Sequence, residues 1–348
     1  MKILVRATNW VGDAVMSIPA LEVVRARWPQ AEIAVLARPW VADLYRDQGY
    51  ADRILVFDHQ GRHRGPLGVE RLAAELRRER FDTALLLQNA FEAAWIARRA
   101  AIRERIGYAR DGRRWLLTRA IAVPNHNETP AHETYYYLEL LRRAGWIEQL
   151  PEVERITLRV STAALEQAED RLARAGVRKG TVRIALAPGA AYGSAKCWPP
   201  ERFAQLADRL IADFDADVII FGAAAEREVA DRISGGMRHR PVTLVGQTKI
   251  GELPALFARC RVFIGNDSGA MHVAGAVGLP VVGIFGPTDP FGTAPVTPER
   301  ALVQERVSCS PCFLRHCPVD HRCMTRVQTD AVYEAARPWL VRRSNGLA

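Results

Sequence analysis

The sequence predicts an α/β protein made of two doubly wound domains, each a parallel sheet covered by helices on both faces. The chain has 348 residues, which suffices for two domains at a prior of about 150 residues each. Short runs rich in Ile, Val and Leu alternate with longer helical patterns through both halves. The runs are continuously apolar rather than alternating, which is typical of parallel strands covered on both faces by crossover helices.

In the first half, five apolar runs predict strands and two amphipathic segments predict helices. The helical segments cover residues 14–28 and 69–80, with apolar residues at i, i+3 and i+4 spacing. The expected strands are 2–7, 32–37, 53–56, 83–87 and 105–108.

The second half repeats the scheme after a break in periodicity at Leu150-Pro151-Glu152. We place the domain boundary between Trp146 and Val160, which gives domains over 1–155 and 156–326. The expected strands are 183–187, 216–221, 242–245, 262–264 and 281–285, and the expected helices are 162–175, 200–213, 225–235, 250–259 and 269–277. Two such sheets would bind ligands beyond the carboxyl ends of their strands.

Composition excludes several classes of protein. Hydrophobic residues make up 49% and charged residues 25%, an ordinary balance for a globular protein that argues against disorder and against a disulfide-held miniprotein. No stretch reaches the roughly 18 uninterrupted apolar residues of a membrane span. The first six residues enter a strand-like run without a signal-peptide pattern, so we expect a cytoplasmic protein.

The charge balance points to an anionic partner. The formal net charge is +9, and 44 of the 48 basic residues are arginine. Codon bias would explain that excess equally well, but arginine also grips phosphate with a bidentate fork. Within residues 98–119 eight arginines face only two acidic residues, Glu104 and Asp111. Solvated surfaces usually mix the signs more evenly, so this segment predicts an anion-attracting surface.

The loop after the first strand places a carboxylate at the start of a helix. Asp13 follows Gly12, which permits a tight turn. Asp13 either caps the helix, a common role worth about 1 kcal/mol, or acts as a general base at a ligand site. Since G-x-G-x-x-G is absent, a dinucleotide-dependent dehydrogenase is disfavoured.

Two loops of the second half suit a phosphate. The segment 188–199 contains Gly189, Gly193 and Lys196, one of four lysines in the chain. A lysine in a glycine-containing loop beyond a strand is either a solvated residue or a phosphate ligand, and the Walker motif is not matched. In the segment 266–272, Ser268 precedes a helix of small residues whose bare N–H groups suit a phosphate or pyrophosphate.

Further polar residues of these loops fit a nucleotide. His272 lies one turn into the small-residue helix and adds a donor to the same anion. Glu226 follows the strand 216–221, where it either holds ribose hydroxyls or serves as a first-turn acid of its helix. Thr248 and Lys249 lie in a loop that would line a base pocket.

Four cysteines form the spacing C-x2-C-x4-C-x5-C: Cys309, Cys312, Cys317 and Cys323. Tetrahedral zinc accepts four thiolates, but the second half of the cluster lacks the usual C-x2-C or H-x3-H pair. We therefore expect no metal, and keep structural zinc at these cysteines as the alternative to a packed thiol-rich loop.

Taken together, the loops resemble those of the ADP-heptose:lipopolysaccharide heptosyltransferase family. The resemblance rests on V-G-D-A-V-M-S-I-P at 11–19, P-G-A-A-Y-G-S-A-K-C-W-P at 188–199, N-D-S-G-A-M-H at 266–272 and F-G-P-T-D-P at 285–290. The cysteine-rich stretch 309–324 looks most like the heptosyltransferase II branch. The family implies a GT-B fold, two Rossmann-like domains facing across a cleft, in which residues 327–348 form a helical segment that returns to the N-terminal domain.

The resemblance also implies roles for individual residues. Asp13 matches the catalytic base and Lys196 the lysine at the donor phosphates. The residues implied for donor binding are Ser194, Glu226, Thr248, Lys249, Asp267, Ser268, Gly269, Met271 and His272. For the acceptor we expect Asn9, Trp10, Arg62, Arg64, Arg110 and Arg113. Where relatives carry a Thr pair before the lysine, this chain has Ala191-Tyr192, so backbone N–H groups or Ser194 would replace those hydroxyl contacts.

The implied activity is an inverting transfer of L-glycero-D-manno-heptose from ADP-heptose to the heptosyl-Kdo2-lipid A inner core of lipopolysaccharide. No cofactor is required by this reading. The amphiphilic acceptor and the basic charge are compatible with peripheral contact at the cytoplasmic face of the inner membrane. Two alternatives are a GT-B transferase with another nucleotide sugar or acceptor and a basic nucleic-acid-binding protein. The nucleic-acid reading is disfavoured because the arginines form no aromatic-interleaved platform, so we expect no nucleic-acid partner.

Overall fold

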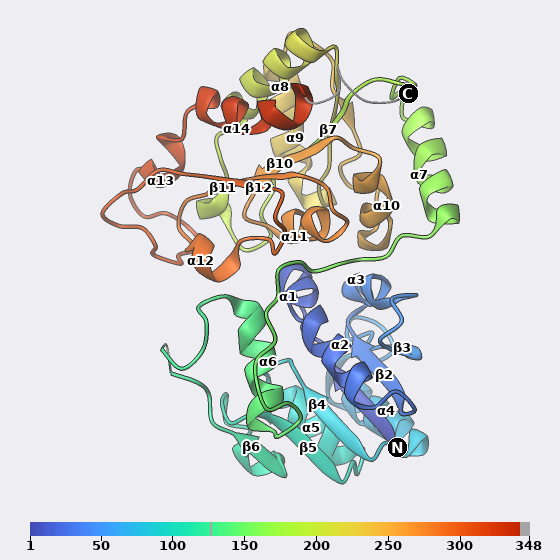
Figure 1. The fold of residues 1–348 in the computed structure, drawn as a ribbon. Helices are drawn as coiled ribbons and strands as arrows, with labels where there is room; N and C mark the ends of the chain where they lie inside the picture. Colours follow the sequence, from blue (N-terminus) through green and yellow to red (C-terminus); the bar gives the residue numbers. More distant parts are fainter. Residues whose placement is uncertain (126, 342–348) are drawn as a thin grey trace. The chain divides into compact units, whose positions relative to one another are not determined.

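A computed structural model describes residues 1–125 and 127–341 and divides the chain into two compact units, Met1–Val153 and Glu154–Ala348 (Figure 1). Both units are built on parallel strands, so the predicted α/β class is confirmed. Each unit is described by itself.

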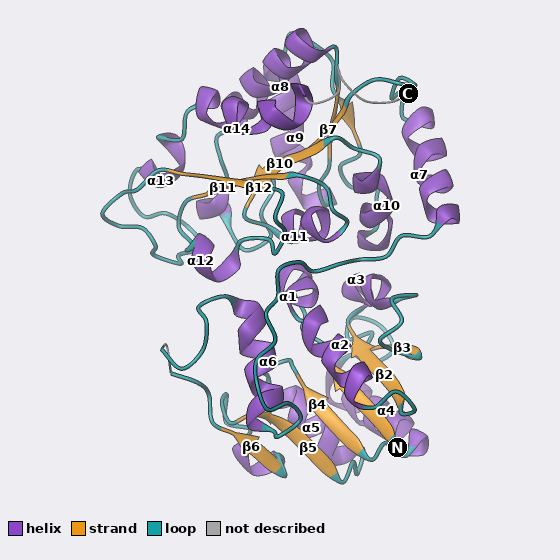
Figure 2. Ribbon diagram, in the orientation of Figure 1, coloured by secondary structure: helices purple, strands orange, loops and turns teal. Residues whose placement is uncertain are grey.

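In the described part of the first unit, a six-stranded parallel sheet has the order β3-β2-β1-β4-β5-β6. Helices cover both faces, α2 packing with α6 on one and α4 with α5 on the other (Figure 2). The strands are β1 (Lys2–Arg6), β2 (Glu32–Ala37), β3 (Arg53–Val56), β4 (Thr83–Leu86), β5 (Glu104–Tyr108) and β6 (Arg119–Ile121). The helices are α1 (Val11–Met16), α2 (Ile18–Arg27), α3 (Pro39–Ala42), η1 (Asp43–Tyr45), α4 (Gly65–Glu79), α5 (Phe91–Arg99), η2 (Arg114–Leu116) and α6 (Glu133–Arg143).

The described part of the second unit repeats this architecture, with the strand order β12-β11-β10-β7-β8-β9. Here α8 packs with α9 and α14, and α10 packs with α7 and α11. The strands are β7 (Arg183–Ala187), β8 (Asp217–Ile220), β9 (Val242–Thr243), β10 (Val262–Asn266), β11 (Val281–Phe285) and β12 (Arg300–Gln304). The helices are α7 (Thr162–Arg174), η3 (Ser194–Lys196), α8 (Pro200–Phe214), η4 (Ala224–Glu226), α9 (Arg227–Gly236), η5 (Ile250–Glu252), α10 (Leu253–Ala258), α11 (Gly269–Ala276), α12 (Pro290–Thr293), α13 (Arg322–Thr325) and α14 (Thr329–Val341).

Both sheets change direction of winding beside their first strand, which positions the ligand-binding loops. The central strands β1 and β7 are almost fully buried, which explains why their sequences are continuously apolar. On one side of each lies the next strand of its unit, and on the other lies β4 or β10. Such topological switch points are where doubly wound sheets bind ligands, beyond the carboxyl ends of the strands.

Two elements differ from the sequence prediction. The helix expected over 14–28 is two helices that meet at Ser17, because Pro19 lacks an N–H and fits only the first turn of the second. The edge strands β6 and β12 were not predicted, since they are short or partly exposed and lack a continuous apolar run.

The C-terminal helix α14 also differs from expectation. We expected residues 327–348 to return to the N-terminal domain, but α14 packs against α8, β10, β11 and β12. Its buried residues Val332, Tyr333, Ala336 and Leu340 belong to the core of the second unit. Residues 342–348 lie outside the described residues.

None of the helices in the described ranges combines the length and the apolar character that crossing a membrane requires.

Candidate active site

The centre of the candidate site in the second unit is an ion pair across the switch point. Lys196 ends the short helix η3 in the loop after β7, and Asp267 directly follows β10. Lys196 Nζ lies 2.6 Å from Asp267 Oδ2, and the two side chains are only 13% and 5% exposed. The predicted phosphate lysine and the predicted donor-site carboxylate are therefore brought together.

Two residues that the sequence analysis missed hold this pair in place. Thr288 Oγ1 donates to Asp267 Oδ2 at 2.7 Å from the loop after β11. Asn266 accepts from Trp198 N at 3.0 Å and donates to the Pro188 carbonyl at 2.6 Å, which ties the end of β10 to the Lys196 loop. Both residues lie in the motifs 266–272 and 285–290, but only their side-chain hydrogen bonds show that they position the ion pair.

The N-terminus of α11 adds backbone donors beside the ion pair. Ser268 is the N-cap, yet its hydroxyl makes no capping bond and its buried Oγ has no hydrogen-bond partner among the described residues. Met271, predicted as a donor ligand, is not available for this role. Its side chain is fully buried, and its N–H is donated to the Ser268 carbonyl. His272 is 5% exposed, one turn into the helix. The groups aligned for an anion are therefore the first N–H groups of α11 and the Ser268 hydroxyl.

Glu226 is fixed at the neighbouring strand end. Its Oε2 accepts from Ala223 N at 2.7 Å, so it does serve as a first-turn acid of its helix. The carboxylate also lies against Gly189 and Gly222, where a Cβ atom would overlap it. Burial raises the pKa of Glu226. The glycines of two separate loops thus make room for one carboxylate.

The cysteine-rich segment braces the Lys196 loop. The Arg315 carbonyl accepts from Ala195 N at 3.0 Å, and Tyr192 Oη donates to the Phe313 carbonyl at 2.9 Å. Ser194 Oγ lies 3.0 Å from His316 Nδ1, so this predicted donor ligand is already engaged. The other two predicted donor residues, Thr248 and Lys249, lie in the loop before η5.

The four cysteines have free thiols, and Cys309 and Cys312 are exposed. Burial, together with the neighbouring thiols, raises the pKa of Cys323 to about 11. Within residues 1–125 and 127–341, no three His, Cys, Asp or Glu side chains are grouped so that they would hold a metal ion. The structure thus gives the zinc alternative no preformed ligand set in the described chain.

In the first unit, Asp13 lies in the first turn of α1 and does not cap it. The N-cap is Trp10, without a side-chain capping bond, and Asp13 is the third helical residue. It faces the start of α6, where its charge contributes to raising the pKa values of Glu133 and Tyr137. Simple capping therefore does not explain this carboxylate.

Glu133 gives a pH-dependent prediction for stability. Burial first, and then the charge of Asp13, raise the pKa of Glu133 to about 7 from an ordinary value of 4.5, while Arg110 opposes the shift. Between these two pH values the folded protein keeps a proton that the unfolded chain has lost, so stability falls as pH rises through this window. The loss amounts to about 3 kcal/mol at most.

We expect Glu133→Gln to flatten this decline, measured as the free energy of urea unfolding between pH 5 and 8. Glu128→Gln is the matched control, since hydrogen bonds from Asn125 and Arg143 hold the pKa of Glu128 at about 2, below this window. A decline of the same size in Glu133→Gln would show that Glu133 does not titrate there.

The predicted acceptor-binding residues differ in burial and in hydrogen bonding. Arg113 is fully buried and donates to the Tyr108 carbonyl, the Gln88 carbonyl and Asn89 Oδ1. It is a structural residue, and its prediction as an acceptor ligand is wrong. Arg62, by contrast, is an exposed partner of Glu75. Asn9, Trp10, Arg64 and Arg110 are partly or well exposed.

The anion-attracting surface expected over 98–119 is also reduced by pairing. Arg99 pairs with Glu70 and Arg119 with Glu104, while Arg105 donates to three backbone carbonyls. Glu70 lies outside residues 98–119, so a charge balance over that segment does not include it. The excess of arginine there is therefore partly structural.

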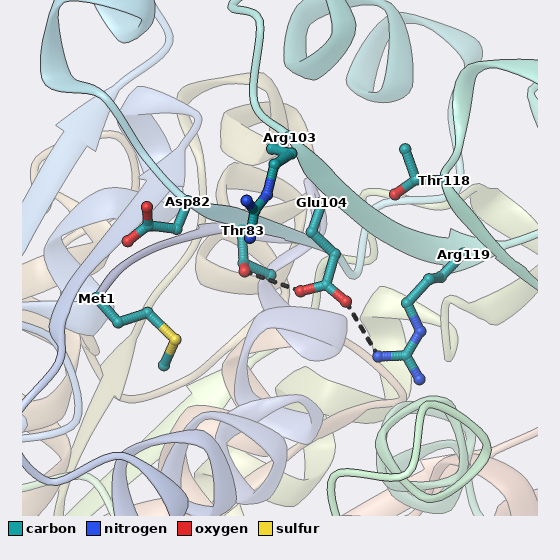
Figure 3. A pocket seen from close by; sticks show the side chains of 7 residues that line it. All are labelled: Met1, Asp82, Thr83, Arg103, Glu104, Thr118 and Arg119. Carbon is teal, nitrogen blue, oxygen red and sulfur yellow. Dashed lines mark hydrogen bonds and ion pairs between the residues drawn. The ribbon is translucent and has the colours of Figure 1, made fainter.

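A hollow of about 640 Å³ lies at the opposite edge of this sheet (Figure 3). Its residues sit at the amino ends of the strands, where Glu104 accepts from Thr83 and pairs with Arg119. The lining residues are Met1, Asp82, Thr83, Arg103, Glu104, Thr118 and Arg119. This position is remote from the carboxyl edge that parallel sheets use, so we do not assign the active site to it.

Comparison with known proteins identifies the family of the chain. The model of glycosyltransferase family 9 (heptosyltransferase) matches residues 69–322. Lipopolysaccharide heptosyltransferase 2 of Escherichia coli strain K12 is 30% identical over 314 residues, covering 87% of this chain and 88% of that protein. Lipooligosaccharide heptosyltransferase 2 of Haemophilus influenzae is 29% identical over 313 residues, with the same coverage.

The solved structures extend the agreement to the fold. The E. coli ADP-heptose lipopolysaccharide heptosyltransferase II has a TM-score of 0.83 at 26% identity, covering 99% of this chain and 100% of that chain. A family 9 glycosyl transferase from Veillonella parvula has a TM-score of 0.85 at 22% identity, covering 98% and 97%. The GT-B fold expected from the resemblance is confirmed. The chain is a glycosyltransferase and belongs to glycosyltransferase family 9, the heptosyltransferases.

Proposed function

We propose that this enzyme transfers L-glycero-D-manno-heptose from ADP-heptose to the heptosyl-Kdo2-lipid A inner core of lipopolysaccharide. The names of its relatives support both substrates. The observation that carries the donor assignment is the Lys196–Asp267 pair beside the N-terminus of α11. It combines a fixed cation with the first N–H groups of a helix, which lack intrahelical partners, at a switch point of the sheet.

The proposed donor site uses groups of different kinds. Lys196 and the first N–H groups of α11 bind the diphosphate, together with the Ser268 hydroxyl. Glu226 accepts hydrogen bonds from the ribose hydroxyls, as an acid past a strand end does in nucleotide-binding folds. The proposed site is completed on the adenosine and phosphate sides by Gly269, Thr248, Lys249 and His272.

The proposed reaction is a single displacement with inversion. Asp13 takes the proton of the acceptor hydroxyl as its oxygen attacks the anomeric carbon of the donor. The bond from that carbon to the diphosphate oxygen breaks, and ADP leaves with the bonding electron pair. Lys196 and the α11 dipole stabilise the charge that develops on ADP. Because the acceptor is a lipid, the enzyme acts in this proposal at the cytoplasmic face of the inner membrane, which it contacts peripherally.

The test uses purified protein with ADP-heptose and heptosyl-Kdo2-lipid A, followed by mass spectrometry. We expect one heptosyl residue to be added, with no addition from UDP-glucose and none to Kdo2-lipid A. Transfer from the UDP-sugar, or transfer only to the acceptor that lacks heptose, would replace this proposal by a family 9 activity with another substrate.

The glycine at 189 provides a test of the donor site. In Gly189→Ala the new Cβ overlaps the Glu226 carboxylate, which must swing out of its position. Losing its hydrogen bonds to the donor should raise KM for ADP-heptose about tenfold, while KM for the acceptor stays within twofold. The matched control is Gly235→Ala, where a Cβ meets no atom within 4 Å. An unchanged donor KM in Gly189→Ala would remove Glu226 from the donor site.

A further inference from the structure

Two buried arginines lie side by side at the carboxyl edge of the first unit's sheet. Arg6 is the last residue of β1, and Arg38 directly follows β2. Both flank the ring of Phe57, which directly follows β3: the guanidinium carbons lie 5.6 and 3.9 Å from its centroid. Arg6 is 2% exposed and Arg38 7%. The neighbouring strands β1 and β2 thus place two cations beside one ring, which follows β3.

The charge of this pair is only partly compensated. Arg38 pairs with Glu92 at 3.0 Å, whereas Arg6 donates to the carbonyls of Ala7 and Leu36 and to Asn9 Oδ1. Two guanidinium charges therefore face a single carboxylate among the described residues. Burial, and next the charge of Arg38, lower the pKa of Arg6 to about 10. A second anion at this position would relieve that repulsion.

Some hydrogen-bond donors of the two arginines also lack an acceptor among the described residues. Arg38 Nη1 and Arg6 Nε are buried and have no hydrogen-bond partner among the described residues, and the same holds for Nδ1 of neighbouring His59. More than nine in ten buried polar groups in native proteins are paired. Unpaired N–H groups on buried cations are therefore the mark of an absent acceptor.

The surroundings connect this position to the loop that carries Asp13. Asn9, which accepts from Arg6, lies four residues before Asp13, and its carbonyl accepts from Trp40 Nε1 at 2.8 Å. Trp40 is 39% exposed and packs edge-on against His59. An incoming ligand that displaces the Trp40 indole breaks a single hydrogen bond.

We propose that Arg6 and Arg38 bind one anionic group of the acceptor, a carboxylate or a phosphate, and so orient the hydroxyl that Asp13 deprotonates. This inference rests on the proposed function, in which Asp13 serves the acceptor and the second unit holds the donor. The anion is then bound by a buried, preorganised pair rather than by the arginine-rich segment 98–119. Guanidinium forks suit both carboxylate and phosphate.

The test compares Arg38→Gln with the wild-type enzyme. We expect KM for the acceptor to rise about tenfold to a hundredfold, the size of a lost charged hydrogen bond, while KM for ADP-heptose stays within twofold. Arg38→Lys keeps the charge and should recover part of the loss. Arg46→Gln is the matched control, an exposed arginine of the same unit paired with Asp43.

A binding measurement separates this inference from the proposed activity. Isothermal titration with the deacylated acceptor oligosaccharide should show the same loss of affinity in Arg38→Gln. The wild-type protein should lose the same affinity for an oligosaccharide whose carboxylates are reduced, or for one whose phosphates are removed. The modification that weakens binding identifies the anionic group that Arg6 and Arg38 bind. Equal affinities of Arg38→Gln and wild type for the intact oligosaccharide would overturn the inference, whereas a wild-type enzyme that binds but transfers no heptose would overturn only the proposed function.

Discussion

Asp13→Asn is expected to lower kcat by about 10²–10⁴ while KM for ADP-heptose stays within twofold, because general-base catalysis contributes in that range. The substitution is nearly isosteric, and Asp13 is the third residue of α1 rather than its N-cap. The substitution also removes a negative charge from the first turn of α1, an effect worth about 0.3–1 kcal/mol. A large fall in kcat with little change in stability is therefore the signature of the base.

The matched control is Asp43→Asn, an acid in the first turn of another short helix of the same unit. It should share the small electrostatic loss and keep its turnover. The rate should be followed with saturating donor and acceptor, so that binding does not obscure the chemical step. Turnover in Asp13→Asn within threefold of wild type would remove this carboxylate from the mechanism.

The elements that could be predicted are those whose own sequence determines them. Strands such as β2, β3, β7 and β11 are continuous runs that the apolar pattern delimits correctly. The loops after them follow from the topology, because parallel strands send their carboxyl ends to one edge. The family resemblance, and not the topology, singled out Lys196 and Asp267, which are 71 positions apart in the sequence.

What could not be predicted depends on partners distant in the sequence. Arg113 and Arg110 look alike in a basic segment, but only Arg113 finds three acceptors and is buried. Arg38 follows a strand as an ordinary charged residue, and its importance arises from Arg6 and Phe57, which lie on neighbouring strands. Charge counting over a window fails at such positions because burial and pairing decide the effect of a charge.

The Lys196–Asp267 pair has both a structural and a catalytic consequence, and the two can be separated. Lys196→Met removes the cation that the proposed mechanism uses on the departing ADP, so kcat should fall about 10²–10³-fold, as when one stabilising donor is lost from an active site. It also leaves Asp267, only 5% exposed, with Thr288 as its remaining side-chain partner. Breaking a buried pair in this way lowers the free energy of unfolding by about 3–5 kcal/mol.

The double variant Lys196→Met/Asp267→Asn distinguishes the two effects. A neutral amide at 267 still accepts the Thr288 hydroxyl and carries no unpaired charge, so most of the lost stability should return. Activity should not return, because the positive charge at the diphosphate is still missing. Urea unfolding and steady-state rates are measured on the wild type, Lys196→Met, Asp267→Asn and the double variant, which together form a double-mutant cycle. Recovery of kcat together with stability would mean that Lys196 only holds the loop in place, and the charge on ADP would then have to be stabilised by the N–H groups of α11 alone.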